Sequence, residues 1–435
     1  MKIKSILVIL FAALAIYPML GQQRPLGIEQ AIEMALNNSE KSKIADTRVS
    51  TAGYELKSTK SHRYPDLDLS GQYLHLTKAN ADIKLDRGDT EEQPAANSPD
   101  IGYLMIGQAK ASVPIFNGFK TTNLIKAGKN KFQAAVFNAK DEKQQIALTT
   151  VQEYVDLYKA DISVELIEDN LVRAKQRVSD FSAMEQNGLL ARNDLLKAQL
   201  QQSNIELNLE QAKKNQKIAN FKLVTLLHLP TGTLIEIQNN DFNAPGLLEL
   251  NDSIQRGDLE ALYFEKEAAK NQIGVAKSSY YPSLAITGGY TALDVENVLT
   301  VTDAMNVGLG ISYNLANIIK AGNKVKAAKS KVKELEYTMD LVKDQIDIQI
   351  EDAMQNYELS LKKYDVYQKA QAQAIENYRI VKDKYDNGLV DTNDLLEADL
   401  DQLQAKINLA YAKADISQRY YELLNAKGII NTAIN

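Results

Sequence analysis

Few residues in this chain have the types and spacing that catalysis requires. The 435 residues include no cysteine and three histidines, His62, His75 and His228, which lie far apart in the sequence. No glycine-rich phosphate loop, metal-ligand spacing or nucleophile motif accompanies them. We therefore predict that the protein is not an enzyme and that it holds no metal or cofactor.

The polar residues that do recur in a pattern lie in two segments 200 residues apart. The shared residues are Gly188, Leu189, Asn193 and Asp194 in the first segment and Gly388, Leu389, Asn393 and Asp394 in the second. The glycines can adopt the left-handed conformation that ends a helix. The asparagines are predicted N-caps of the next helices, and the aspartates suit the positive helix ends. Each segment therefore predicts the turn of a helical hairpin.

The charges at the two predicted turns differ. Asp394 is followed one helical turn later by Glu397, whereas Asp194 is followed by Lys197. Only the second turn is doubly acidic. Such a pair on a helix surface ordinarily faces solvent, and that alternative stays open beside a functional role.

The chain as a whole consists of two copies of one unit. Tyr64-Pro65 and the alternating residues after it match Tyr281-Pro282 and its successors at an offset of 217 residues. The difference between the two offsets falls in a polar stretch from Thr77 to Asp100, which we expect to be a loop longer than its counterpart near Asp294 to Asp303. In repeat 1 (22–228) the predicted elements are a helix from about Leu26, strands at about 64–74 and 103–116, a long helix 118–186 and a return helix 193–228. In repeat 2 (253–427) they are an opening helix, strands at about 281–292 and 305–316, a long helix 318–386 and a return helix 393–427.

The long helices carry coiled-coil seams. A helix over 118–186 would be roughly 100 Å long. Its apolar residues alternate by three and four, as in a coiled coil. The seam of the first long helix is Leu157, Ala160, Val164, Ile167, Leu171, Ala174, Val178 and Phe181, and that of the second return helix is Leu396, Leu400, Leu403, Ile407, Ala410 and Ala414. An opening helix (Leu26 to Ser61) and a return helix, end to end, match the length of one long helix.

The predicted strands alternate apolar with small or polar residues. In the last strand Met305, Val307, Leu309 and Ile311 alternate with polar residues and glycines. Four such strands are typical of an outer-membrane barrel, although each signal alone is weak. A sheet in lipid must close on itself, and about eight strands are the practical minimum. The chain must therefore oligomerise if it spans a membrane, and the pattern admits a dimer with eight strands or a trimer with twelve.

Composition and the first residues narrow the location. Fifty basic against 56 acidic residues give a net charge of −6, which offers no electrostatic case for nucleic acid. Residues 1–21 are an expected signal peptide, with Lys2 and Lys4 before an apolar run from Ile6 to Ile16. No cysteine follows that could carry a lipid anchor.

In these features the sequence resembles the TolC family of outer-membrane factors, from about Leu26 to Ile429. The segment Pro114-Ile115-Phe116-Asn117-Gly118, the duplicated Gly-x5-Asp-Leu-Leu turn and the internal repeat carry the resemblance. It implies a mixed α/β membrane protein: a homotrimer with one 12-stranded barrel, four strands per chain, continued by a periplasmic tunnel of coiled-coil helices. The segment 229–252 and the tail 428–435 would form a belt around the tunnel.

The resemblance also implies what the turns do. Gly188, Leu189, Gly388 and Leu389 would contact a periplasmic adaptor. Asp394 and Glu397 would line the narrow end, and Tyr385 would bond Asp194 to hold it closed. Val390 stands where some members have an arginine, so this gate departs from the family pattern.

We therefore predict the exit duct of a tripartite efflux pump or type I secretion system, in the outer membrane, acting with an adaptor and an inner-membrane RND or ABC-type transporter. The alternative is a periplasmic coiled-coil structural or adaptor protein without a pore. A monomeric barrel is disfavoured because the chain ends after a helix and not in a strand with a terminal aromatic residue.

Overall fold

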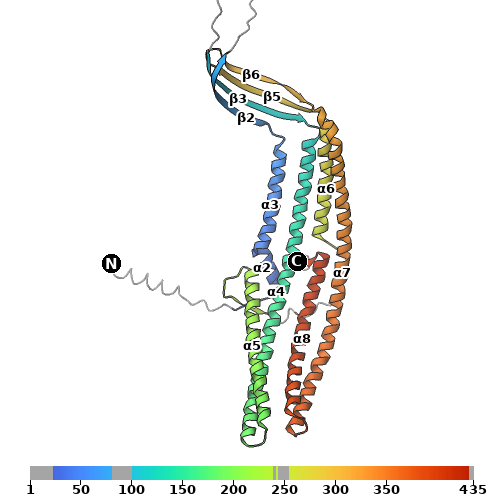
Figure 1. Ribbon diagram of the computed structural model, residues 1–435. Helices are drawn as coiled ribbons and strands as arrows, with labels where there is room; N and C mark the ends of the chain where they lie inside the picture. Colours follow the sequence, from blue (N-terminus) through green and yellow to red (C-terminus); the bar gives the residue numbers. More distant parts are fainter. Residues whose placement is uncertain (1–22, 81–99, 239–241, 243–253, 431–435) are drawn as a thin grey trace, which may run out of the picture. The chain divides into compact units, whose positions relative to one another are not determined.

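The computed structural model describes residues 23–80, 100–238, 242 and 254–430 (Figure 1). They fall into a helical unit, Met1–Arg48, Phe137–Leu259 and Leu341–Asn435, and a strand unit, Val49–Val136 and Glu260–Asp340. The predicted signal segment lies outside the described residues, as do most of the predicted loop from Thr77 to Asp100 and much of 229–252. No helix among the described residues is long and apolar enough to cross a lipid bilayer.

The strand unit is built on one antiparallel sheet of four strands in the order β2-β3-β5-β6. These are β2 (Asp66–Asn80), β3 (Asp100–Phe116), β5 (Ser283–Val295) and β6 (Leu299–Ser312). Each repeat supplies one hairpin, and the pairing of β3 with β5 joins the two hairpins into one sheet. Consequently β2 and β6 are the edges, and each pairs on one side only within the described chain.

The second strand pair is longer than expected, and the predicted loop from Asp294 to Asp303 is wrong. The chain turns within Glu296–Val298, where Asn297 has φ 60°, and β6 already begins at Leu299. The polar residues near this turn belong to the ladder. Thr300 donates a hydrogen bond from Oγ1 to Asp294 Oδ1 at 2.7 Å, so polar composition there did not mean a loop.

One set of apolar side chains on the edge strands is open to the surroundings. Leu69 on β2 is 87% exposed and Val307 on β6 is 83% exposed. Leu67, Met305, Leu309 and Ile311 are similarly exposed. The strand register places these side chains on one face of the sheet, so the predicted alternation is confirmed, and the described residues leave this apolar face exposed.

In the strand unit the helices next to the sheet form a single layer. α4 (Lys120–Gln186) lies between α3 (Glu40–Ser61) and α6 (Gly257–Lys277). Gly128 approaches Leu56 of α3, and Gly274 of α6 approaches Asn123, so each neighbour contacts a different side of α4. A short 3₁₀ helix, η3 (Ser278–Tyr280), follows α6, and α7 (Leu315–Asp386) begins after β6.

The opening helix is divided in two, contrary to the single helix expected. α2 (Ile28–Asn38) is followed by Ser39, whose ψ of 144° is extended. The Ser39 hydroxyl accepts a hydrogen bond from the Ser42 amide at 3.3 Å, and this serine cap starts α3. A capping residue inside an otherwise helical pattern therefore produces the break.

The helical unit contains two antiparallel hairpins, α4–α5 and α7–α8 (Figure 1). α5 spans Arg192–Leu226 and α8 spans Thr392–Lys427. The predicted seam of α4 is buried at Val164, Leu171 and Ala174 against apolar residues of α5, which are Ile205, Leu209 and Ala212. Thus α3 contacts the first turns of α4 and α5 contacts its later turns, as the helix lengths predicted.

The largest core lies where the first strand and the end of α8 meet the helices. β1 (Gln23–Leu26) pairs in parallel with β4 (Leu234–Ile237). The buried Tyr154 hydroxyl of α4 donates to the Leu26 carbonyl at 2.7 Å. Ile429 and Ile430, after the α8 cap at Gly428, are buried in the same cluster. The strands and the end of α8 are therefore fixed to α4 by one apolar core.

Candidate functional site: the two helical turns

The two turns have the same backbone. Gly188 and Gly388 have φ of 73° and 72°, the left-handed conformation predicted for a helix stop. The Leu189 amide donates to the Met184 carbonyl at 2.8 Å, and the Leu389 amide donates to the Lys384 carbonyl at 2.9 Å. This is the Schellman pattern. The two leucines are 74% and 73% exposed, so each turn presents one bare apolar side chain.

The predicted N-caps are wrong. The helices begin one residue before Asn193 and Asn393, and the capping residues are Ala191 and Asp391. Asp391 accepts hydrogen bonds from the amides of Asn393 and Asp394, and Asp394 Oδ2 accepts from the Asp391 amide at 3.3 Å. This reciprocal capping box satisfies the backbone amides of Asp391, Asn393 and Asp394, which a cap at Asn393 would leave without these acceptors. Ala191 makes no side-chain cap, so the second turn is the better braced.

Tyr385 joins the two hairpins near the turns. Its ring stacks on Phe181 of α4 with centroids 5.7 Å apart, in a cluster with Leu195 and Leu395. Its hydroxyl lies 3.4 Å from Thr392 Oγ1. Burial raises the Tyr385 pKa, and the nearby negative charge of Asp194 raises it further. The structure thus brings Tyr385 and Asp194 into one neighbourhood, while the described hydrogen bond goes to Thr392.

A buried charge network lies further along the same helices, and sequence reasoning missed it. Asp399 of α8 is fully buried, and its Oδ2 accepts from Arg177 Nη2 at 2.9 Å and from Asn170 Nδ2 at 3.2 Å. Arg173 Nε lies 3.7 Å from Asp399 Oδ1. Arg177 also donates to Gln201 Oε1 at 3.2 Å. The network therefore links the α4–α5 hairpin of repeat 1 to α8 of repeat 2.

The seam predicted for the second return helix is right at Leu396 and Ala414, which are buried, and wrong at Leu400. Leu400 is 45% exposed, whereas Asp399 and Gln402 are buried. A search for apolar periodicity passes over a seam that is partly polar. The signal available in the sequence was the i, i+3, i+4, i+7 spacing of Leu395, Ala398, Asp399 and Gln402, which places them on one face of the helix, and the structure buries all four.

The acidic residues predicted for the narrow end share one exposed face of α8. Asp394 and Glu397 are exposed, and Asp401 continues the row one turn later. Within the described ranges none of these three carboxylates forms an ion pair. In the first hairpin Asp194 instead lies 3.5 Å from Lys197 Nζ. The second turn is thus anionic and the first is internally compensated.

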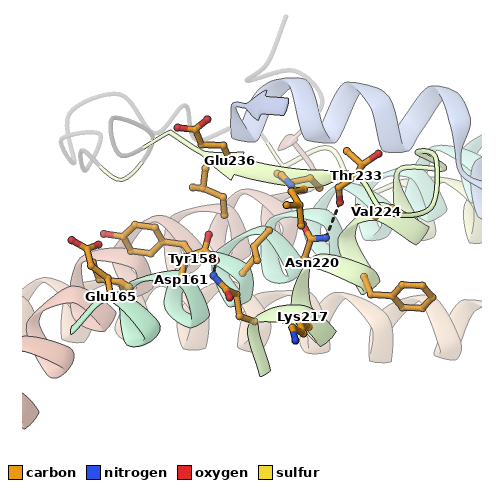
Figure 2. Close-up of a pocket in the computed structure, with 16 residues that line it drawn as sticks. Tyr158, Asp161, Glu165, Lys217, Asn220, Val224, Thr233 and Glu236 are labelled. Carbon is orange, nitrogen blue, oxygen red and sulfur yellow. Dashed lines mark hydrogen bonds between the residues drawn. The ribbon is translucent and has the colours of Figure 1, made fainter. Parts of the chain in front are cut away.

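A cavity of about 520 Å³ lies apart from the turns, between α4, α5 and β4 (Figure 2). Asn220 holds its wall together, because it donates to the Thr233 carbonyl at 2.9 Å and accepts from the Ile235 amide at 3.0 Å. Asp161 accepts from Gln216 Nε2 at 2.9 Å, and burial raises the Asp161 pKa. In the part of the chain described here, no group of three or more His, Asp or Glu side chains is placed to hold a metal ion.

A four-stranded antiparallel sheet with a bare apolar face and two long helical hairpins with matching turns are the features of an outer-membrane channel with a periplasmic helical part. The chain matches the model of the family "Outer membrane efflux protein" over residues 31–227 and 253–428. It belongs to that family, and it is located in the outer membrane with its helices in the periplasm.

Individual relatives agree with this assignment. The chain is 22% identical over 331 residues to the outer membrane efflux protein BepC of Brucella suis biovar 1 (strain 1330), covering 72% of this chain and 70% of BepC. The Campylobacter jejuni outer membrane channel CmeC superposes with a TM-score of 0.77 at 20% identity, covering 92% of this chain and 85% of CmeC. Vibrio cholerae VceC gives 0.73 at 17% identity, over 92% and 96% of the two chains. These structures share its fold, and the TolC-like resemblance of the sequence is confirmed.

Proposed function

We propose that the chain assembles as a homotrimer whose sheets close into one 12-stranded barrel, continued by a helical tunnel. The observation that carries the proposal is the open sheet, whose two edge strands each lack a partner on one side in the described chain. Unpaired backbone groups at a sheet edge are not tolerated in lipid, so the edges must pair with other copies.

Closure by copies of the same chain is geometrically consistent. The four strands alternate in direction, so β6 of one copy would meet β2 of the next in the antiparallel sense. The bare side chains of both edge strands, Leu69 and Val307 among them, would then lie in one apolar band facing lipid. Three copies give twelve strands, the number that the family resemblance implies.

The turns would then form the periplasmic end of the duct. Gly188, Leu189, Gly388 and Leu389 would contact a periplasmic adaptor, which links the duct to an inner-membrane RND or ABC-type transporter. Asp394 and Glu397 from three copies would bring six carboxylates near the axis. Such a ring concentrates cations. Tyr385, Asp194 and the buried Asp399 would hold the hairpins together in the closed state, and the duct would supply no energy itself.

The absence of cysteine makes a direct test of trimer closure possible. Each variant carries two new cysteines, one in β2 and one in β6, and membranes that contain it are oxidised. We expect covalent ladders up to the trimer for the register-matched pair. A control pair, Ser112→Cys with Thr287→Cys, faces across the β3–β5 ladder and should cross-link only within one chain. Failure of every edge pair to link copies, with the control pair linking, would refute the closure.

The acidic ring has its own test in planar bilayers. Asp394→Asn with Glu397→Gln should lower the preference for cations over anions. The control, Glu210→Gln, removes an exposed carboxylate of α5 that lies away from both turns and should change selectivity little. Selectivity that is unchanged by the double variant would reject the ring.

The adaptor contact is tested at Gly388. Gly388→Asn keeps the left-handed turn and adds a short side chain, whereas Gly388→Phe adds bulk and strain. No atom of the described chain lies within 4 Å of the place that a Cβ would take at this position, so bulk there would obstruct a partner and not the chain. We expect efflux to fall in the Phe variant while trimers still form.

The alternative of a poreless periplasmic protein is disfavoured by the family membership.

A further inference from the structure

The helix segments that adjoin the sheet carry a surplus of lysine that the proposed duct does not need for closure or gating. The start of α4 has four lysines and no acidic residue up to Lys131, and the start of α7 has six lysines and no acidic residue up to Lys333. All ten are exposed. We call them the basic collar: Lys120, Lys126, Lys129, Lys131, Lys320, Lys324, Lys326, Lys329, Lys331 and Lys333.

The described residues neutralise little of the charge of the collar. Lys331 Nζ lies 2.6 Å from Glu334 Oε1, and Lys333 Nζ lies 5.6 Å from the centre of the Tyr337 ring. Apart from Lys331, no collar lysine forms an ion pair with the described residues. A band of uncompensated like charge repels itself, so it is stabilised by an anionic partner.

The collar lysines lie on two opposite faces of each helix. At 100° per residue, Lys320, Lys324 and Lys331 share one face of α7, and Lys326, Lys329 and Lys333 share the other. The buried residues Ala321, Val325 and Val332 lie between the two rows. On α4, Lys120 and Lys131 are likewise opposite Lys126 and Lys129. A tunnel wall one helix thick has an inner and an outer face, so one row of each helix faces outward.

The collar begins where the apolar sheet ends. Phe116, Phe119 and Tyr281 form a cluster of edge-to-face rings with centroids 5.3 to 6.3 Å apart at this junction. Phe119 is more than half exposed. Aromatic girdles mark the membrane–water boundary of outer-membrane barrels. Lys120 follows Phe116 by four residues and Lys320 follows the end of β6 by eight. At 1.5 Å per residue Lys120 and Lys320 lie in the headgroup layer, whereas Lys131 and Lys331 lie roughly 16 Å farther along their helices.

We propose that the outward lysine row of the collar binds anionic phospholipid headgroups of the periplasmic leaflet. This proposal rests on the proposed function, because it needs the sheet to span the outer membrane. Lysines close to an anionic surface each strengthen membrane attraction by roughly fivefold. Three chains repeat the row, so the collar would seat the trimer at a fixed depth and gather phosphatidylglycerol or cardiolipin around it.

The test compares the two rows of α7. The variants are Lys320→Gln, Lys324→Gln, Lys331→Gln together and Lys326→Gln, Lys329→Gln, Lys333→Gln together. A matched control neutralises three exposed lysines farther along the same helix, Lys362, Lys363 and Lys369. Each full-length trimer is reconstituted with phosphatidylcholine and phosphatidylglycerol, and the lipid retained after washing is measured by mass spectrometry.

We expect the wild type and the control to enrich phosphatidylglycerol, and one of the two row variants to retain at least about tenfold less of it. The other row variant should keep its lipid. If neither row changes the enrichment, the proposal is overturned. A wild type that shows no lipid preference but sediments with peptidoglycan sacculi through the same lysines would also overturn it in favour of the cell wall. Conductance is recorded on the same samples. A wild type that conducts but shows no lipid preference refutes only the proposal that the collar binds anionic lipid. A wild type that does not conduct contradicts the proposed duct.

Discussion

The buried carboxylate of Asp399 makes a demanding prediction, because its charge connects the two repeats near their turns. Asp399→Ala removes the acceptor for Arg177 and Asn170 and leaves the Arg177 guanidinium, 9% exposed, without its counterion. Breaking a buried ion pair by deleting one partner costs about 3–5 kcal/mol. We expect that loss to appear as easier separation of α8 from the α4–α5 hairpin.

Hydrogen exchange on the solubilised trimer measures this separation directly. Since each 1.4 kcal/mol is a factor of ten, protection of the amides in the first half of α8 should fall by about 10²- to 4 × 10³-fold. The matched control is Asp401→Ala, two residues away on the exposed face. A surface change of this kind alters stability by at most about 0.5 kcal/mol. In bilayers, Asp399→Ala should also raise the resting conductance, whereas the control should not.

A double replacement separates the charge from the contact. Arg177→Met with Asp399→Leu removes both charges and keeps apolar volume, and such swaps are often neutral or stabilising. Asn170 and Arg173 lose their contact with Asp399 in this variant, so we expect protection above that of Asp399→Ala but below that of wild type. If Asp399→Ala kept its protection within about threefold, or if the double variant were as unstable as the single one, the ion pair would not be what holds the hairpins together.

Three further predictions follow from individual contacts. Tyr385→Ala should destabilise the turn region by about 3–5 kcal/mol through loss of the stack on Phe181, while Tyr385→Phe should cost no more than about 1.5 kcal/mol, as judged by thermal unfolding. Burial raises the Asp161 pKa above its unfolded value, so stability falls as the pH rises from the unfolded pKa to the folded pKa and stays lowered above it. Asp161→Asn should therefore raise the Tm at pH 7.5, and this gain should vanish below the unfolded pKa. Gly428→Ala should lower the Tm, because the Gly428 φ of 75° is unfavourable for alanine and a Cβ there would collide with the Gln255 carbonyl. Equal Tm values for the variant and the wild type would contradict this backbone strain.

Local patterns made much of the fold predictable. The alternation in β6 and the three-four spacing in α4 depend on neighbours in sequence. The β5–β6 ladder confirms the first, and the buried seam of α4 confirms the second. Gly188 and Gly388 were sufficient to place the turns, since few other residues adopt their φ. The break at Ser39 was missed because a serine inside a helical pattern is usually just a surface residue. Its role becomes visible only from the Ser42 amide that it caps.

The candidate site was less predictable because its key contacts join distant segments. Arg177 and Asp399 are 222 positions apart, and nothing in either neighbourhood indicates the partner. The N-caps were misassigned because Asn393 and Asp391 are both good capping residues, and only the reciprocal bond to Asp394 decides between them. The adaptor contacts and the acidic ring involve surfaces that face other molecules, so they stay predictions.

The two turns have one backbone geometry but opposite electrostatic characters. A partner built from identical subunits that touches both would meet a neutral surface around Asp194 and Lys197 and an anionic one around Asp394, Glu397 and Asp401. The two docking positions are therefore only quasi-equivalent. Either the same residues of the partner bind them with unequal strength, so that occupancy proceeds in two stages, or the partner uses different residues for each.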